Sequence, residues 1–209
     1  MAQPPGWDQH HGVRSTPVTV WPWLAESWIA SDDRVRGGRS QSYLDYNNPG
    51  SRETVRFHGE LDITALGGAG FASQRSPDPQ HWDLSSFQGL HLAIGGGDGK
   101  KYTLIVKDEI LPRRPDGREH STVSWEYDFT GEGTKLDIPW KDLKPTYRGK
   151  PKPDAKPLDL ASIKRISIMM RSFFGEQEGL FELELEHITA AVFQEQSSFD
   201  NPAEVGSPK

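Results

Sequence analysis

The sequence contains no cysteine among its 209 residues. This excludes disulfide bonds, a thiolate nucleophile and the usual structural zinc sites. The seven histidines do not have the HExxH-like spacing that would replace cysteine, so we expect no metal centre and leave open only an oxygen-ligated calcium. No apolar run approaches the roughly 20 residues that span a bilayer, and the N-terminus lacks the apolar core of a signal peptide. We therefore expect no membrane insertion.

Excess positive charge is also missing, since the formal net charge at pH 7 is −6. Nucleic acids and anionic membranes attract clustered Lys and Arg, so this balance argues against both as general partners and leaves room only for a local basic patch. Residues 1–20 carry Arg14 and Asp8, a poor match to an arginine-rich, acid-poor mitochondrial presequence. We expect a cytoplasmic protein, or a mitochondrial one if the sequence begins after presequence cleavage.

The fingerprints of nucleotide-binding enzymes are missing as well. Residues 95–100 read GGGDGK, but Ile94 and Lys101 stand where a phosphate-binding loop needs Gly and Ser or Thr, and a strand-like run follows. We expect a hairpin turn at Asp98-Gly99 instead. The glycines of residues 67–70 lack the third glycine of a dinucleotide fingerprint and predict a turn or bulge.

Hydrolytic motifs are equally scarce. No GxSxG elbow marks a serine nucleophile. Asp108-Glu109 follows a predicted strand, and Glu176 and Glu178 lie in a predicted turn, so solvated surface is favoured over a glycosidase pair. His120 lies in a polar loop and receives no role. These absences favour a protein that is not an enzyme and needs no cofactor.

Alternation of apolar and polar residues dominates the middle of the chain, which is typical of strands with one buried face. It covers residues 55–61, 90–94, 102–106, 123–129, 166–171 and 181–186. The last run loses phase at His187 and Ile188, so we predict a β-bulge or strand end near Glu186 and His187. Helical periodicity is limited to short turns within residues 23–30, 140–143 and 159–163. The fold class we predict is all-β, an antiparallel sandwich or jelly roll with few short helices.

The two ends differ from the middle in composition. Residues 1–17 and 194–209 are rich in Pro, Gly, Ser and Gln, so we expect a flexible N-terminal tail, one domain over residues 18–193 and a disordered C-terminal tail. His10-His11 falls in the first tail, where only transient metal contact is expected. Phe199-Asp200 in the second tail resembles a short docking motif, which leaves open that the tails carry the function.

The most charged stretch is residues 31–42, SDDRVRGGRSQS, with two acids, three arginines and one large apolar side chain. It follows a tryptophan-rich run at residues 21–28, so we expect a polar loop outside the core, held on an aromatic base. Such loops often carry function. The alternative is that Ser31 or Asp32 caps a helical turn and Gly37-Gly38 forms the next turn, with the arginines merely solvated.

Seven strings, taken in order, resemble the complex I intermediate-associated protein 30 family over residues 28–191. They are SDDRVRGGRSQS, GFASQRS, WDLSSFQGLHL, GDGKKYTLIVKDE, SWEYDF, IPWKDLKPTYRGK and PLDLASIKRISIMMRSFFGEQEGLFELELEHI. The resemblance implies a jelly roll like galactose-binding domains and carbohydrate-binding modules. It also implies a non-catalytic assembly factor, or chaperone, for NADH:ubiquinone oxidoreductase, and it supplies no set of catalytic residues.

A candidate binding site follows from the strand pattern combined with these strings. Arg75 and Arg171 are the arginines nearest to ladder positions, where a planar five-donor group could grip a carboxylate, phosphate or sugar diol, and Trp125 or Tyr127 would supply a stacking face. The candidate set is Arg36, Arg39, Arg75, Trp125, Tyr147, Arg148 and Arg171. The alternative is that the aromatic side chains belong to the core and the arginines pair with acids across strands.

Two functions remain open from the sequence. The first is a non-catalytic module that holds a protein client, which the family resemblance identifies with intermediates in complex I assembly. The second is a cytosolic relative that binds a carbohydrate or another small molecule in a concave groove, with any catalysis coming from positioning and electrostatics.

Overall fold

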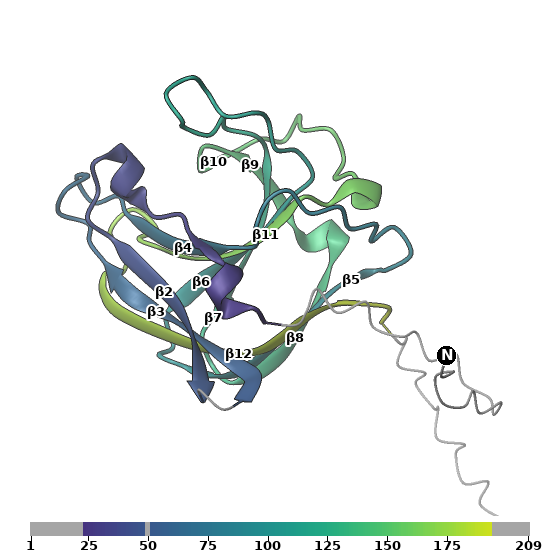
Figure 1. Ribbon diagram of the computed structural model, residues 1–209, viewed down its shortest axis with the longest axis horizontal. Helices are drawn as coiled ribbons and strands as arrows, with labels where there is room; N and C mark the ends of the chain where they lie inside the picture. The colour runs from purple at the N-terminus through teal and green to yellow at the C-terminus, as the bar shows by residue number, and fades with distance from the viewer. Residues whose placement is uncertain (1–22, 49–50, 194–209) are drawn as a thin grey trace, which may run out of the picture.

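Two antiparallel sheets stack face to face in the computed structural model, which describes residues 23–48 and 51–193 (Figure 1). The seven-stranded sheet contains, in spatial order, β1 (Ile29–Ala30), β4 (Phe71–Arg75), β11 (Arg165–Arg171), β6 (Lys101–Lys107), β7 (Ser124–Thr130), β9 (Lys144–Tyr147) and β10 (Lys150–Pro151). The five-stranded sheet contains β2 (Gln41–Asn48), β3 (Ser51–Leu61), β12 (Gly179–Ala191), β5 (Gly89–Gly97) and β8 (Thr134–Pro139). The predicted all-β sandwich is confirmed.

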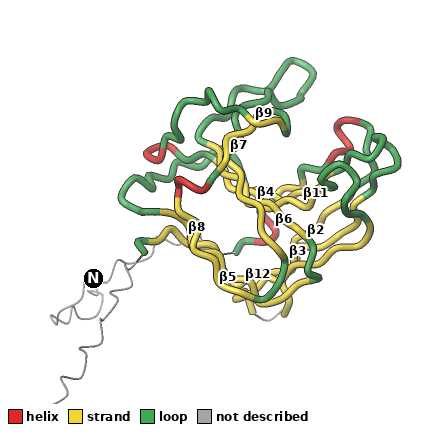
Figure 2. Tube along the Cα trace, turned by 180° about the vertical axis from the view of Figure 1, so that it is seen from behind, coloured by secondary structure: helices red, strands yellow, loops and turns green. Residues whose placement is uncertain are grey.

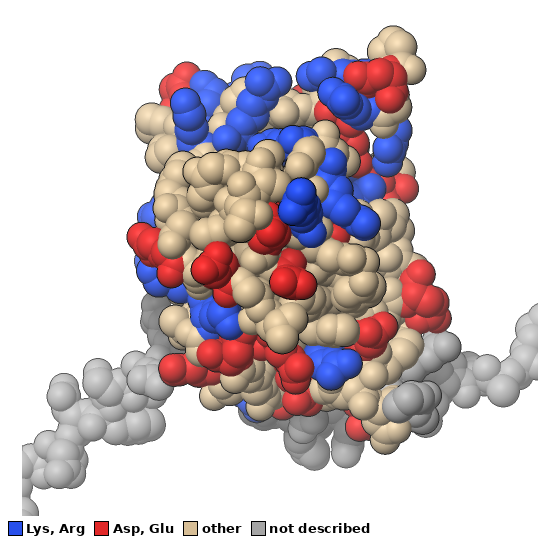
Figure 3. Space-filling model, turned by 90° about the vertical axis from the view of Figure 1, so that its left-hand side faces the viewer, with Lys and Arg blue, Asp and Glu red and all other residues tan. Residues whose placement is uncertain are grey.

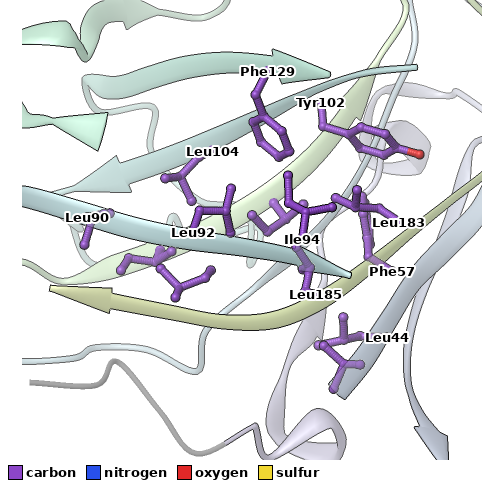
Figure 4. Packing of buried hydrophobic residues seen from close by; sticks show 14 of the residues in the cluster. Leu44, Phe57, Leu90, Leu92, Ile94, Tyr102, Leu104, Phe129, Leu183 and Leu185 are labelled. Carbon is purple, nitrogen blue, oxygen red and sulfur yellow. The ribbon is translucent and has the colours of Figure 1, made fainter. Parts of the chain in front are cut away.

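The core lies between the sheets because each central strand points alternate side chains inward. Tyr102 of β6 lies beside Phe57 of β3, and both are buried together with Leu104 of β6 and Leu183 of β12 (Figure 4). The rings of Phe57 and Phe181 lie 5.0 Å apart, in a tilted contact. Tyr102 also donates a hydrogen bond of 2.9 Å to Asp98, and burial raises the pKa of this phenol. All six stretches predicted from alternation are strands.

The predicted bulge is present in β12. Leu185 pairs with Ile94 and His187 pairs with Ala93, so the register leaves Glu186 without a partner in β5. The extra residue returns Ile188 to the core, which an unbroken pleat would not allow. The Glu186 carbonyl then accepts a hydrogen bond of 2.8 Å from the indole N–H of Trp23. Trp23 of the tryptophan-rich run therefore supplies a hydrogen-bond donor to the backbone carbonyl of the bulged residue.

The predicted short turns are also found (Figure 2). η1 (Ala25–Ser27), η3 (Trp140–Asp142) and η4 (Leu160–Ser162) are single 3₁₀ turns, and η2 (Asp33–Arg36) is a fourth, inside the charged stretch. The glycine turn expected at residues 67–70 is confirmed, with Gly67 and Gly68 at φ of 63° and 93°. The predicted tails at residues 1–17 and 194–209, with His10-His11 and Phe199-Asp200, lie outside the described residues.

The hairpin predicted at Asp98-Gly99 is wrong. Gly99 does turn the chain, at φ of 74°, but β5 belongs to the five-stranded sheet and β6 to the seven-stranded sheet. The turn therefore carries the chain from one layer to the other. Alternation identifies two strands and a turn between them, and it does not reveal whether those strands share a sheet. Within the described residues no helix is long and apolar enough to cross a membrane.

Candidate functional site

The outer face of the seven-stranded sheet collects the charged residues that the sequence singled out. On β11 the outward phase holds Arg165, Ser167, Met169 and Arg171, because Ile166, Ile168 and Met170 fill the core. Arg75 of β4 lies beside Ser167 in register, and Phe71 lies beside Arg171. The two predicted ladder arginines, Arg75 and Arg171, therefore share this face at opposite ends of two neighbouring strands.

The charged stretch at residues 31–42 enters the protein interior, which corrects the expectation that it stays outside the core. Asp32 accepts hydrogen bonds from the Ser42 hydroxyl (2.6 Å), the Ser42 N–H (3.1 Å) and the Ser73 N–H (3.0 Å). Ser42 belongs to β2 and Ser73 to β4, so this buried carboxylate joins the two sheets. Its side chain does not cap η2, and the expected cap is absent because the carboxylate bonds to strands instead.

Asp33 accepts a second set of buried hydrogen bonds, which we call the Asp33 tie. It accepts from the Ser40 hydroxyl (2.7 Å), the Ser40 N–H (3.1 Å) and the Phe71 N–H (3.1 Å). Gly38 lies against it so closely that a Cβ there would come within 2.2 Å of the carboxylate. Gly37 has φ of 86° and ends the turn. Because both acids point inward, the exposed charges of this loop are the arginines.

An ion-pair network built on two buried arginines closes one end of the outer face. We call it the Arg165 network: Arg75, Asp78, Glu119 and Arg165. Arg165 donates to Asp78 Oδ1 at 2.7 Å and to Glu119 Oε2 at 2.9 Å, and Arg75 contacts both carboxylates, with 3.2 Å to Glu119. Burial would raise the pKa of Glu119, but hydrogen bonds and charges from the arginines hold it below its usual value. The network fastens the loop that follows β6 onto the sheet.

Lys107, at the end of β6, adds a cation beside this network. It donates to the Thr122 hydroxyl at 2.9 Å. Burial, together with repulsion from Arg165, lowers the pKa of the Lys107 ammonium to about 8. Glu119, Glu126 and Asp108 act in the opposite direction and do not compensate. The Lys107 ammonium is therefore held in a partly desolvated setting, which costs stability.

We expect Lys107→Met to unfold at a higher temperature than wild type at pH 7, by about 1 kcal/mol of added stability, because it removes a poorly compensated buried charge. Folding lowers the pKa of Lys107 from its ordinary value of 10.5 to about 8, so Lys107 does not destabilise the fold above pH 10.5, and its destabilising effect grows as the pH falls from 10.5 to about 8. The advantage of Lys107→Met should thus shrink between pH 8 and 10.5. Thermal melts of both proteins across that range test this, and a constant difference would contradict it.

Arg171 holds the other end of the face. Its guanidinium reaches across β6 to Glu126 Oε2 and Asp128 Oδ1 of β7, both at 2.7 Å. It also lies 4.6 Å from the ring centroid of Phe173. The cross-strand pairing that the sequence left open as an alternative is what the structure contains for Arg171, and Arg75 is likewise paired with acids.

The predicted stacking residues do not face this surface. Trp125 and Tyr127 pack against the core because they share the inward phase of β7 with Phe129. The proposal that Trp125 supplies a stacking face on the groove is therefore wrong. Tyr147 is exposed at the end of β9, with the Arg148 guanidinium 5.4 Å from its ring centroid.

The predicted rim arginines divide between the two ends. Arg36 lies 5.4 Å from the ring centroid of Phe71, next to Arg171, and Arg39 is exposed on the same loop. Arg148 donates to the Ser121 hydroxyl at 3.2 Å, on the loop that the Arg165 network fastens. Arg36, Arg75 and Arg171 lie along this face, Arg39 lies near the Asp62 carboxylate, and the candidate arginines do not meet in one pocket.

Sequence reasoning missed Asp78, Lys107, Glu119 and Arg165. The sequence pattern could have identified Arg165, because it has the same strand phase as Arg171 six residues later. Lys107 likewise shares its phase with Lys101 on β6. No comparable signal exists for Asp78 and Glu119, which lie in loops outside the strands.

The opposite face carries a different set of groups. The imidazoles of His58 and His91 lie 2.7 Å from the carboxylates of Asp45 and Asp137. A hollow of about 310 Å³ opens beside His58, Asp98 and Glu182. In the view of Figure 3, Lys and Arg gather mainly in the upper half, on the side of the seven-stranded sheet, while Asp and Glu predominate below. Among the described residues no three His, Asp or Glu side chains are grouped to hold a metal ion.

Comparison with known proteins identifies relatives of the whole domain. The family model described as complex I intermediate-associated protein 30 matches residues 22–185. An uncharacterized protein of Schizosaccharomyces pombe is 42% identical over 174 residues, covering 80% of this chain and 79% of that protein. No function follows from that relative's name.

Among solved structures, the chain is similar to carbohydrate-binding modules of family 11 from Clostridium thermocellum. One, in complex with a β-1,3-1,4-mixed-linked tetrasaccharide, has a TM-score of 0.57 at 12% identity, over 86% of this chain and 98% of the module. Another, from the cellulosomal cellulase Lic26A-Cel5E, has a TM-score of 0.57 at 13% identity, over 86% of this chain and 97% of the module. At such identity the likeness concerns the fold.

Proposed function

Because the chain belongs to the complex I intermediate-associated protein 30 family, we propose that it is a non-catalytic binding module that holds a protein client during assembly of that complex. The family gives the client class. We assign the client-binding surface to the outer face of the seven-stranded sheet.

The observation that carries this proposal is that some cations on that face are paired with acids of the chain, while others are exposed to solvent. The two ends of β4 and β11 are already satisfied internally, since Arg75 and Arg171 are bound to carboxylates of the chain itself. The rim instead exposes Arg36, Arg39 and Tyr147 to solvent. Arginine and tyrosine are enriched at the hot spots of protein interfaces. Strands held by internal ion pairs, with exposed cations and an exposed tyrosine beside them, suit a broad protein surface better than a small enclosed ligand.

Within this function the predicted site residues take two roles. Arg36, Arg39, Tyr147 and Arg148 would touch the client, and Arg75 and Arg171 would hold the strands and loops that present them. Charge-removing substitutions at Arg75 or Arg171 that leave both folding and every binding activity intact would count against this arrangement.

The direct test is crosslinking affinity purification of the full chain, tagged at its C-terminus, from fractionated cells of the source organism. We expect recovery from mitochondria together with complex I subunits identified by mass spectrometry. Recovery from cytosol without a stoichiometric protein partner would overturn the proposal.

We expect the double variant Arg36→Glu, Arg39→Glu to slow association with the recovered client by about tenfold at low salt, because rim charges act mainly on the encounter rate. The control is Arg56→Glu on the opposite sheet, where Arg56 is exposed and lies 3.7 Å from Glu182. Biolayer interferometry at two salt concentrations measures both variants. Equal association rates for wild type and the double variant would remove these arginines from the client site.

A small-ligand function is the second candidate, supported by the hollow of about 310 Å³ beside His58, Asp98 and Glu182 and by the fold shared with carbohydrate-binding modules. Calorimetric titration with a β-1,3-1,4-mixed-linked tetrasaccharide tests it. Saturable binding that Glu182→Gln abolishes, in a protein that recovers no client from cells, would replace the first candidate.

A further inference from the structure

The turn between β11 and β12 holds two consecutive phenylalanines in left-handed backbone conformations. Phe173 has φ of 46° and Phe174 has φ of 63°. Residues with a Cβ rarely adopt this conformation, because the Cβ approaches the following carbonyl. Phe174 is nevertheless 93% exposed. The chain thus keeps a large apolar ring in solvent, at a position where glycine would be free of strain.

The turn is firmly held, so motion does not relieve the strain. The N–H groups of Gly175, Glu176 and Gln177 all donate to the Ser172 carbonyl, at 3.0, 2.9 and 3.3 Å. The Gln177 amide nitrogen donates to the carbonyls of Arg171 (2.6 Å) and Lys101 (2.8 Å). The fold therefore positions Phe174 but gains no buried area from its ring. Persistent strain of this kind is concentrated at functional sites.

A second exposed apolar tip lies on the same end of the sandwich. Val35 of η2 is 70% exposed. The two tips are linked through the outer face, because the Arg36 guanidinium lies over the ring of Phe71 and Phe71 pairs in register with Arg171. Arg171 in turn lies over the ring of Phe173. We call Val35, Phe174 and the exposed Arg34, Arg36 and Arg39 the tip surface.

The charge of the tip surface follows from the burial of the two aspartates. Asp32 and Asp33 are both buried and bonded to Ser side chains and backbone N–H groups. The three arginines of the same loop are exposed. An apolar tip flanked by arginines matches an apolar pocket with carboxylates at its rim.

We propose that the tip surface docks an acidic protein client, with Phe174 inserted into an apolar pocket whose rim carboxylates meet Arg34, Arg36 and Arg39. This inference rests on the proposed function and adds the anchor and the chemistry of the partner. Exposed Glu176 and Glu178 follow Phe174 within four residues, so the uniform negative charge of an anionic membrane would repel them, whereas the carboxylates of a protein client can lie on the arginine side of the pocket rim, away from these glutamates.

Phe174→Gly is the most informative variant, because it should raise the stability of the protein and weaken its binding to the client. Glycine adopts φ of 63° freely, so the melting temperature should rise by about 2–4 °C through relief of backbone strain in a chain of this size. Binding to the client recovered by affinity purification should weaken by about 30-fold or more, as for loss of an interface anchor. The control is Val192→Gly, which removes an exposed apolar side chain after β12 and should leave client binding unchanged.

Photocrosslinking locates the contact independently. Benzoylphenylalanine at position 174 should crosslink the purified client, and the same group at position 192 should not. Retained affinity in Phe174→Gly, or a fall in its melting temperature that explains the lost affinity by unfolding, would overturn the tip surface while leaving the client function standing. Recovery of no client by wild type would overturn both proposals. Binding to vesicles of phosphatidylcholine with 20% phosphatidylserine that Phe174→Gly abolishes would replace the protein partner with a membrane.

Discussion

Replacing Arg165 with methionine is expected to lower the free energy of unfolding by about 3 kcal/mol. Arg165 is only 5% exposed and binds two carboxylates, Asp78 and Glu119. Methionine keeps much of the apolar stem but removes one of the two buried arginines that Asp78 and Glu119 share, so Asp78, with a side chain only 18% exposed, loses charge-assisted hydrogen bonds in a partly desolvated setting. Urea denaturation monitored by tryptophan fluorescence measures the change.

Arg113→Met is the matched control, because Arg113 reaches the same Glu119 carboxylate at 3.4 Å with a side chain that is 61% exposed. Exposed pairs contribute little, so we expect a loss below about 1 kcal/mol. Similar losses for Arg165→Met and Arg113→Met would mean that burial does not govern this network.

The Arg165 network also connects stability to the proposed client site. Glu119 belongs to the same loop as Ser121, the partner of Arg148. Loosening that loop should therefore weaken client association under conditions where Arg165→Met is still folded. The Arg165 network would then support client binding by positioning the loop that holds Arg148.

Sequence alternation predicted the strands whose inner faces are apolar, and it failed where the inner face is polar. β4 illustrates the failure, because its inward residues are Ala72 and Gln74, and the Gln74 amide donates to the Ser42 carbonyl. A buried glutamine satisfied by a neighbouring strand looks like a loop residue in sequence. β9 likewise has no fully buried side chain, so its pairing depends on neighbours that the sequence alone does not reveal.

The candidate site was predicted in part for the same physical reason. The phase of β11 placed Arg171 outward, and that placement is confirmed. The partners of the arginines could not be predicted, because Glu119 reaches Arg75 and Arg165 only after the loop folds over the sheet. The charged stretch at residues 31–42 misled because its composition is polar throughout. Its acids are buried by hydrogen bonds to strands that are distant in sequence.

Asp33→Ala is expected to lower the free energy of unfolding by about 3 kcal/mol, because it leaves the N–H groups of Ser40 and Phe71 without their acceptor in a buried setting. Asp33→Asn should also destabilise, since one of its amide donors would face these N–H groups. Arg34→Ala, which changes the exposed neighbour, should alter stability by less than about 0.5 kcal/mol. Chemical denaturation compares all three, and a loss below 1 kcal/mol for Asp33→Ala would contradict the role of this tie. If the tie does set the position of η2, Asp33→Ala should also reduce client binding at temperatures where the variant remains folded, because Val35 and Arg36 would no longer be held beside Phe71.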